Sequence, residues 1–293
     1  MKKIKVVLFT LLLVSLLSGC NKSLFEGMDS YSDSDSDVFY AKAEQIINSG
    51  DKTAIADLEV KVEDRIVSNP AEKEQLTLML SEIKMALAGV DIFGTAIKLY
   101  DLINSNNVDV NITSIFELSP NDKDNLKVAV DNYNATLSLT PENVTSEMKK
   151  TYLSAGMANT IYAASLLIDV FDTNGDGKVT EADANVSDAA ITGTTDSVIT
   201  RWASSKEEVI NSIEKSVIYL NTAFGLTGDT ITGSADNKKM VTKVEEIKDE
   251  LSLYALSQAE IDNETDPVKK AKMKLINVNE FQNIISDVLK GNF

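Results

Sequence analysis

Apolar residues recur at intervals of three and four along nearly every segment from residue 38 to residue 289. This is the spacing of a helix that buries one face. Ile55, Leu58, Val62 and Ile66 form one such stripe. No segment shows the sustained alternation of apolar and polar residues that a half-buried strand requires. The sequence therefore predicts an all-α domain over residues 38–293.

Turn residues divide the first part of this pattern into separate helices. We expect helices over residues 38–48 and around 55–66, ended by Gly50 and by Pro70. The next apolar stripe starts at Leu76 and continues through Gly89 to Tyr100. Because its period does not change, this stripe predicts one long helix with a bend.

A second part begins after the break formed by residues 104–107. Ser119 has the composition of a helix N-cap, and Pro120 suits the first helical position. The predicted helices of this part cover residues 120–139, 145–171, 181–191, 196–224, 238–257 and 268–289.

The segment between two of these helices, residues 172–183, carries oxygen-bearing residues at ordered positions. A hard cation takes six or more oxygen ligands, which a chain that turns at a glycine can supply from alternate residues. Gly177 occupies the sixth position, where that turn is needed. The predicted ligands are the side chains of Asp172, Asn174, Asp176 and Asp183, the Lys178 carbonyl and, through water, Thr180.

This spacing resembles the calcium loops of EF-hand and dockerin proteins, and the resemblance implies a Ca²⁺ site. The family usually ends its loop with a bidentate glutamate, whereas the shorter Asp183 would supply one oxygen. The lower coordination number narrows the preference for Ca²⁺ over Mg²⁺. Because the sequence has no second loop of this kind, we expect a structural site with a Kd on the order of 10⁻⁴ to 10⁻³ M. The alternative is an acidic turn that binds no ion.

The N-terminal residues have the three parts of a secretory signal peptide. Lysines at positions 2, 3 and 5 precede an apolar run over residues 6–16, which is shorter than the ~20 residues of a membrane span. The following residues, Leu17-Ser18-Gly19-Cys20, resemble the lipobox of bacterial lipoproteins. The resemblance implies removal of residues 1–19 and lipidation of Cys20. We therefore expect a membrane anchor on the periplasmic or extracellular side of a bacterial envelope.

The charge of the chain restricts its partners. Residues 20–37 alternate serine with aspartate near their end and are expected to form a disordered acidic tether. The formal net charge is −17, and loss of the three signal-peptide lysines makes it −20. Such a surface repels a phosphate backbone, so we expect no nucleic-acid partner.

Residues 127–143 resemble the second helix of a tetratricopeptide repeat. Ala129, Tyr133 and Pro141 stand at its spacing, and the pairs Ala96/Tyr100 and Ala158/Tyr162 repeat its small-then-aromatic step. The resemblance implies a right-handed stack of helical hairpins. However, Pro120 falls where the repeat's first helix should run, and that helix's Trp, Leu and Gly positions are not matched. An irregular helical array is the alternative.

The residues that the chain lacks restrict its chemistry. It has no histidine, and its single cysteine is the predicted anchor. This excludes Ser-His-Asp and Cys-His catalysis as well as zinc bound by histidine or thiolate. We expect a non-catalytic scaffold that binds a protein partner or a small solute, and the resemblance to TPR-like lipoproteins implies a role beside a transport system. The alternatives are a carboxylate hydrolase of the envelope and a purely structural surface lipoprotein.

Overall fold

The computed structural model describes residues 36–90, 119–142, 144–172 and 198–226, with separate positions between 238 and 265. Every regular element in this part of the chain is helical, which confirms the all-α class. The elements are α2 (Ser36–Ser49), α3 (Lys52–Ser68), the 3-10 helix η1 (Pro70–Glu72), α4 (Lys73–Leu87), α6 (Pro120–Thr136), α7 (Ser146–Phe171) and α10 (Val198–Phe224).

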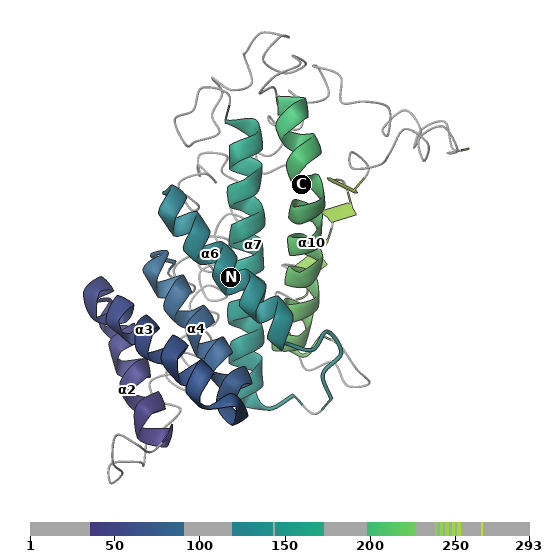
Figure 1. The fold of residues 1–293 in the computed structure, drawn as a ribbon. Helices are drawn as coiled ribbons and strands as arrows, with labels where there is room; N and C mark the ends of the chain where they lie inside the picture. The colour runs from purple at the N-terminus through teal and green to yellow at the C-terminus, as the bar shows by residue number, and fades with distance from the viewer. Residues whose placement is uncertain are drawn as a thin grey trace, which may run out of the picture.

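Helix α7 is the element against which α6 and α10 pack (Figure 1). Gly156 faces Leu220 of α10, and the Thr160 and Ser216 hydroxyls are hydrogen-bonded at 2.6 Å. The two helices are therefore antiparallel. Among the described helices, α7 is long and apolar enough to cross a membrane, but 61% of its apolar window is buried inside the fold. A mostly buried apolar helix is typical of the interior of a helical domain.

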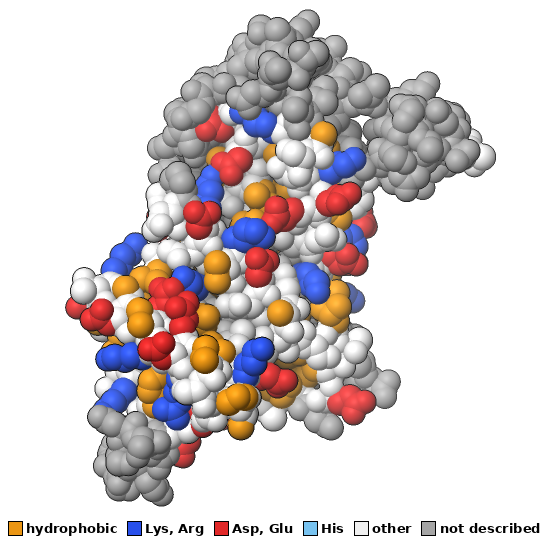
Figure 2. All heavy atoms as spheres, in the orientation of Figure 1, with side chains coloured by type: hydrophobic (Ala, Val, Ile, Leu, Met, Phe, Trp, Pro, Cys, Tyr) orange, Lys and Arg blue, Asp and Glu red, His pale blue; other side chains and the backbone are white. Residues whose placement is uncertain are grey.

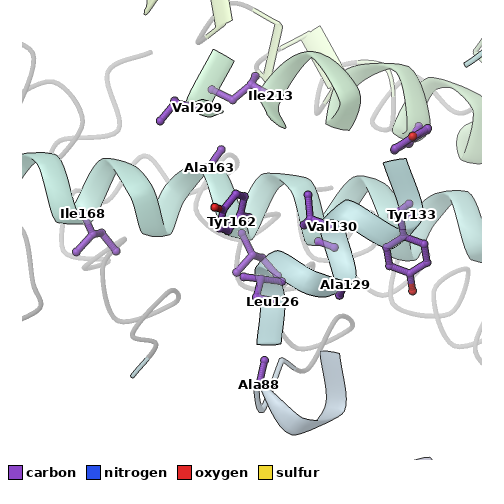
Figure 3. Packing of buried hydrophobic residues seen from close by; sticks show 14 of the residues in the cluster. Ala88, Leu126, Ala129, Val130, Tyr133, Tyr162, Ala163, Ile168, Val209 and Ile213 are labelled. Carbon is purple, nitrogen blue, oxygen red and sulfur yellow. The ribbon is translucent and has the colours of Figure 1, made fainter. Parts of the chain in front are cut away.

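Helix α4 lies between α3 and α6 (Figure 1). On the α3 side, Lys84 pairs with Glu59, and the Lys52 ammonium donates to the Leu87 carbonyl at 3.1 Å. On the α6 side, Ala88 lies below Leu126 in Figure 3, in the same buried cluster. Leu78, nearer the start of α4, lines one pocket with Leu137, which follows the end of α6, so these two helices are also antiparallel.

Two clusters of buried side chains join α4 to the helices on either side of it, and a third, which includes Met157 and Leu220, joins α7 to α10. The larger joins α4, α6, α7 and α10 (Figure 3). It includes Trp202, which is 4% exposed. The smaller joins α2, α3 and α4. On the face in Figure 2, acidic and basic side chains are interspersed over the helices, so this face carries no broad patch of one sign.

The aromatic and small residues singled out in the sequence take part in this packing. Ala129, Tyr133, Ala158 and Tyr162 are all buried in the larger cluster. Their packing role is confirmed. The Ala96/Tyr100 pair lies outside the described residues. A regular right-handed stack of TPR type stays a prediction.

Capping explains most helix boundaries. Ser119 accepts from the Asp122 amide and the Asp122 carboxylate accepts from the Ser119 amide, each at 3.3 Å, forming the capping box that opens α6. The predicted boundary at Asn69 and Pro70 is also confirmed, because α3 ends at Ser68 and η1 begins at Pro70.

The prediction of one long helix through Gly89 is wrong, because α4 ends at Leu87. Gly89 has a φ of +69°, and its amide donates to the Ala86 carbonyl at 3.0 Å. The Val90 amide donates to Met85 at 3.1 Å. These two bonds form the Schellman motif that ends a helix at a left-handed glycine.

Two other predicted boundaries need smaller corrections. Helix α2 begins at Ser36, two residues inside the predicted tether, because the Ser36 hydroxyl contacts Glu72 and accepts from Arg65 at 2.8 Å. Helix α6 ends at Thr136 rather than near residue 139, because Leu137 has an extended ψ of 135°. The predicted helices at 181–191 and 268–289 lie outside the described residues.

Candidate functional site

A groove of about 540 Å³ opens between α4, the end of α6, the α6–α7 connection and the start of α7. Its volume lies in the range of pockets that hold a small molecule, roughly 300–1,000 Å³. We call this space, with its lining residues, the groove. The apolar and aromatic residues that line it are Leu78, Leu137, Pro141, Met148 and Tyr152.

Polar residues complete the lining of the groove. Hydroxyl groups come from Thr136, Ser138, Thr140 and Thr151, and carboxylates come from Glu74 and Glu142. The described lining residues include no lysine or arginine. The groove therefore combines an apolar surface with hydrogen-bonding groups and negative charge.

Local hydrogen bonds fix the α6–α7 connection that forms one wall. The Tyr152 hydroxyl donates to the Ser138 carbonyl at 2.9 Å, and the Thr140 amide donates to the Ser138 hydroxyl at 3.2 Å. The Thr145 hydroxyl caps α7 by accepting from the Met148 amide at 3.2 Å. The first turn of α7 thus holds Met148 at the rim, where it is 37% exposed.

The helix register places a second set of polar residues next to the groove. On α4, Glu82 stands one turn beyond Leu78. On α6, Tyr133 stands one turn before Leu137. Because α4 and α6 are antiparallel, these two steps lead in the same direction, away from the groove and toward the point where Ala88 meets Leu126. Glu82 and Tyr133 therefore lie one turn beyond Leu78 and Leu137, and neither of them is a lining residue of the groove.

Glu82 is exposed to solvent, yet enough protein surrounds it that burial raises its pKa to about 7. The nearby carboxylate of Glu44 on α2 adds to the shift. Glu82 therefore changes its charge near neutral pH.

Tyr133 is fully buried, and its hydroxyl has no hydrogen-bond partner within bonding geometry among the described residues. Burial raises the pKa of Tyr133 well above its usual value, and the negative charge of Glu82 raises it further, while the nearby Ser154 hydroxyl of α7 lowers it. The electrostatic influence of Glu82 agrees with the register that places the two residues side by side.

A second polar cluster consists of Lys127 of α6, Tyr162 of α7 and Glu208 of α10. Its side chains hydrogen-bond to one another. Glu208 accepts from the Tyr162 hydroxyl at 2.7 Å and from the Lys127 ammonium at 2.9 Å. Burial alone would raise the pKa of Glu208, but the two hydrogen bonds lower it. This cluster ties α6, α7 and α10 together.

Of the residues predicted to bind a cation, only Asp172 lies in the described part of the chain. It is 8% exposed, and its amide donates to the Ile168 carbonyl at 2.7 Å as α7 ends at Phe171. Asn174, Asp176, Lys178, Thr180 and Asp183 lie outside the described residues, as do Gly177 and the predicted lipidation residue Cys20. The described residues alone contain no cluster of three or more metal-ligating side chains.

Comparisons with known proteins do not assign the chain to a family. No family model, curated protein or solved structure matches the chain. The proposed function therefore rests on the sequence and the structure of this chain alone.

Sequence reasoning did not find the groove or Glu82. A glutamate next to an apolar stripe is the usual solvent-facing residue of an amphipathic helix. The one available signal is that Glu74, Leu78 and Glu82 share a face of α4 that is neither fully apolar nor fully charged. The sequence did indicate Tyr133, but only as an aromatic residue that packs between helices.

Proposed function

We propose that this chain is a lipid-anchored protein of a bacterial envelope whose helical domain binds a small solute, or a short segment of a partner protein, without catalysis. The observation that carries the proposal is the groove. It joins an apolar surface to hydroxyls and carboxylates, and Leu139 and Met148 expose apolar surface beside or at its rim. The N-terminal pattern ending at Cys20 supports the anchor.

A thermal-shift screen of small solutes tests binding in the groove. A solute that binds only the folded chain adds ~2.7 kcal/mol at 100 times its Kd. Met148→Trp should fill the groove and abolish the shift. Val67→Trp is the matched control, because Val67 is 82% exposed on α3 and does not line the groove. Equal shifts in both variants would place the binding elsewhere.

Fatty-acid labelling tests the anchor. We expect incorporation into the wild-type chain and none into Cys20→Ser, because Cys20 is the only cysteine. An unlabelled wild-type chain would remove the lipoprotein part of the proposal and leave the groove unaffected.

A structural Ca²⁺ site belongs to the same proposal. It is supported by the end of α7 at Phe171, which places Asp172 at the first residue after a helix, where an EF-hand loop begins. Mg²⁺ is the expected competitor, since Asp183 offers a shorter side chain than glutamate.

A carboxylate hydrolase is the second candidate function. The observation that favours it is Glu82, whose raised pKa near 7 suits a general acid and which lies near a second carboxylate, Glu44. Release of fragments from isolated cell-envelope polymer by the wild-type chain, but not by Glu82→Gln, would favour this function over binding alone.

A further inference from the structure

We propose that Met148 is a reversible oxidation site, and that its conversion to methionine sulfoxide weakens the binding of an apolar solute in the groove. The first part depends only on the exposure of the thioether. The second part rests on the proposed binding function and adds a means by which that binding is regulated.

Met148 differs from the other methionines of the described residues in its exposure to solvent. It is 37% exposed at the rim of the groove, whereas Met79, Met85 and Met157 are between 0% and 9% exposed. Each of these three lies in a cluster of buried apolar side chains. Because an oxidant must reach the sulfur atom, the susceptibility of a methionine follows its exposure. Among these four residues, Met148 is therefore the one that oxidises first.

The reaction transfers one oxygen atom from a peroxide to the Met148 sulfur. A sulfur lone pair forms a bond to one oxygen of hydrogen peroxide, the O–O bond breaks, and the departing hydroxide takes the remaining proton and leaves as water. The sulfur loses two electrons and the peroxide gains them. Glu74 and Glu142 line the same groove, and its described lining includes no lysine or arginine. A neutral peroxide therefore avoids the repulsion that an anionic oxidant would meet there.

A sulfoxide at Met148 changes the chemistry of the groove without breaking the bond that starts α7. The Met148 amide donates to the Thr145 hydroxyl at 3.2 Å, and this bond does not involve the sulfur. The thioether lines the groove together with Leu78, Leu137 and Tyr152. A sulfoxide is polar, so an apolar solute that covers it buries an acceptor without supplying a donor. The affinity for such a solute should fall about tenfold, the cost of burying one unpartnered polar group.

Peptide mass spectrometry after graded treatment with hydrogen peroxide tests the oxidation site. The full chain is kept folded in a peroxide-free non-ionic detergent, and each methionine is followed in its own peptide. We expect the Met148 peptide to gain one oxygen at doses that leave the peptides of Met79, Met85 and Met157 unmodified. In urea, where all four are exposed, their rates should converge. Equal rates in the folded chain would overturn the oxidation site.

Calorimetric titration of 2-phenylethanol, a neutral and largely apolar probe, tests the effect on the groove. Detergent alone is the blank. The peroxide-treated chain should bind the probe about tenfold more weakly than the untreated chain. A mixture of the two methionine sulfoxide reductases with their reductant should restore the affinity, because they return the sulfoxide to the thioether. Far-ultraviolet circular dichroism should not change, and a loss of helix at the same dose would attribute the weaker binding to unfolding and overturn the second part.

Two substitutions isolate the sulfur atom. Met148→Leu keeps an apolar side chain of similar volume without sulfur, so its own affinity for the probe should be the same before and after peroxide treatment. Met148→Gln places a polar acceptor at the same position. It should bind the probe about tenfold more weakly than Met148→Leu does, in the absence of any oxidant.

The outcomes separate this proposal from the proposed function. If Met148 oxidises first but the oxidised chain binds the probe as tightly as before, the second part is overturned and the groove remains a binding site. If Met148→Leu also loses affinity after peroxide treatment, other residues cause the effect and the second part fails. If the probe does not bind the untreated chain, the second part fails as well, whereas the screen of small solutes with Met148→Trp still decides the proposed function.

Discussion

Helices α7 and α10 pack closely at Gly156. A Cβ atom added there would lie 2.8 Å from Cγ and Cδ2 of Leu220 and 3.2 Å from the Leu220 backbone nitrogen. Leu220 is 1% exposed, so surrounding atoms restrict its movement. The change Gly156→Ala therefore tests whether the packing of these two helices depends on a glycine.

Two effects of opposite sign decide the result of Gly156→Ala. Alanine favours a helix over glycine by ~1 kcal/mol, which would stabilise the variant. The added methyl, however, sits roughly 0.7–1.2 Å inside the normal contact distance between carbon atoms. Overpacking of this kind costs ~1–3 kcal/mol, and the nearby backbone nitrogen prevents relief by a change of the Leu220 rotamer alone. The cost exceeds the gain over most of this range, so we expect a net loss of up to ~2 kcal/mol and a Tm lower by up to ~8 °C.

Thermal and urea unfolding followed by far-ultraviolet circular dichroism measure this loss. The matched control is the same change in a Leu220→Ala background, where the obstructing side chain is absent. Leu220→Ala alone should cost ~2–5 kcal/mol, but adding Gly156→Ala to it should cost little or stabilise the chain. If Gly156→Ala raises the Tm of the wild-type chain, helix propensity outweighs packing and the reasoning about this crossing is refuted.

Four further predictions follow from single groups. The pKa of Glu82 is raised from 4.5 to about 7, so its contribution to stability is full below about pH 4.5 and is lost as the pH rises through about 7; Glu82→Gln should remove this decline in pH-dependent melting. Tyr133→Phe removes a buried hydroxyl without a partner and should stabilise the chain by ~1 kcal/mol, whereas Tyr152→Phe breaks the bond to Ser138 and should destabilise it by ~1 kcal/mol in urea titrations. Ser119→Ala removes half of the capping box and should cost ~1 kcal/mol, whereas Thr140→Ala, at an exposed loop position outside a helix cap, should cost less. Millimolar Ca²⁺ should raise the Tm more than Mg²⁺ does, and Asp172→Ala should abolish the difference; calorimetry without a Ca²⁺ heat would contradict it.

The helices were predictable where local chemistry sets them. Ser119 and Pro120 mark the start of α6, and the apolar period carries α7 to Phe171 and α10 to Phe224, where the structure also ends them. The prediction of one helix through Gly89 failed for a definite reason. The apolar period continues past this residue, so the pattern alone does not reveal that Gly89 adopts a left-handed φ and closes α4 with two backbone bonds.

The groove was not predictable because it depends on register between helices. Leu78 and Leu137 are 59 positions apart in the sequence, and only the antiparallel packing of α4 on α6 brings them to one space. Periodicity assigns a residue to a face of its own helix, but it does not say which residue of another helix lies opposite. The sequence alone therefore does not distinguish a carboxylate that lies beside a groove from an ordinary surface carboxylate.

The groove and the predicted cation loop lie at opposite ends of α7. Met148 and Thr151 line the groove in its first turns, whereas Asp172 follows its last residue. A helix of 26 residues spans about 39 Å, so an ion held by Asp172 would not contact a ligand beside Met148. Such an ion would act on the groove only through the position and stability of α7. Since α7 is buried against α6 and α10 along this length, we expect Ca²⁺ to change the Tm of the chain without changing the affinity of the groove for a solute.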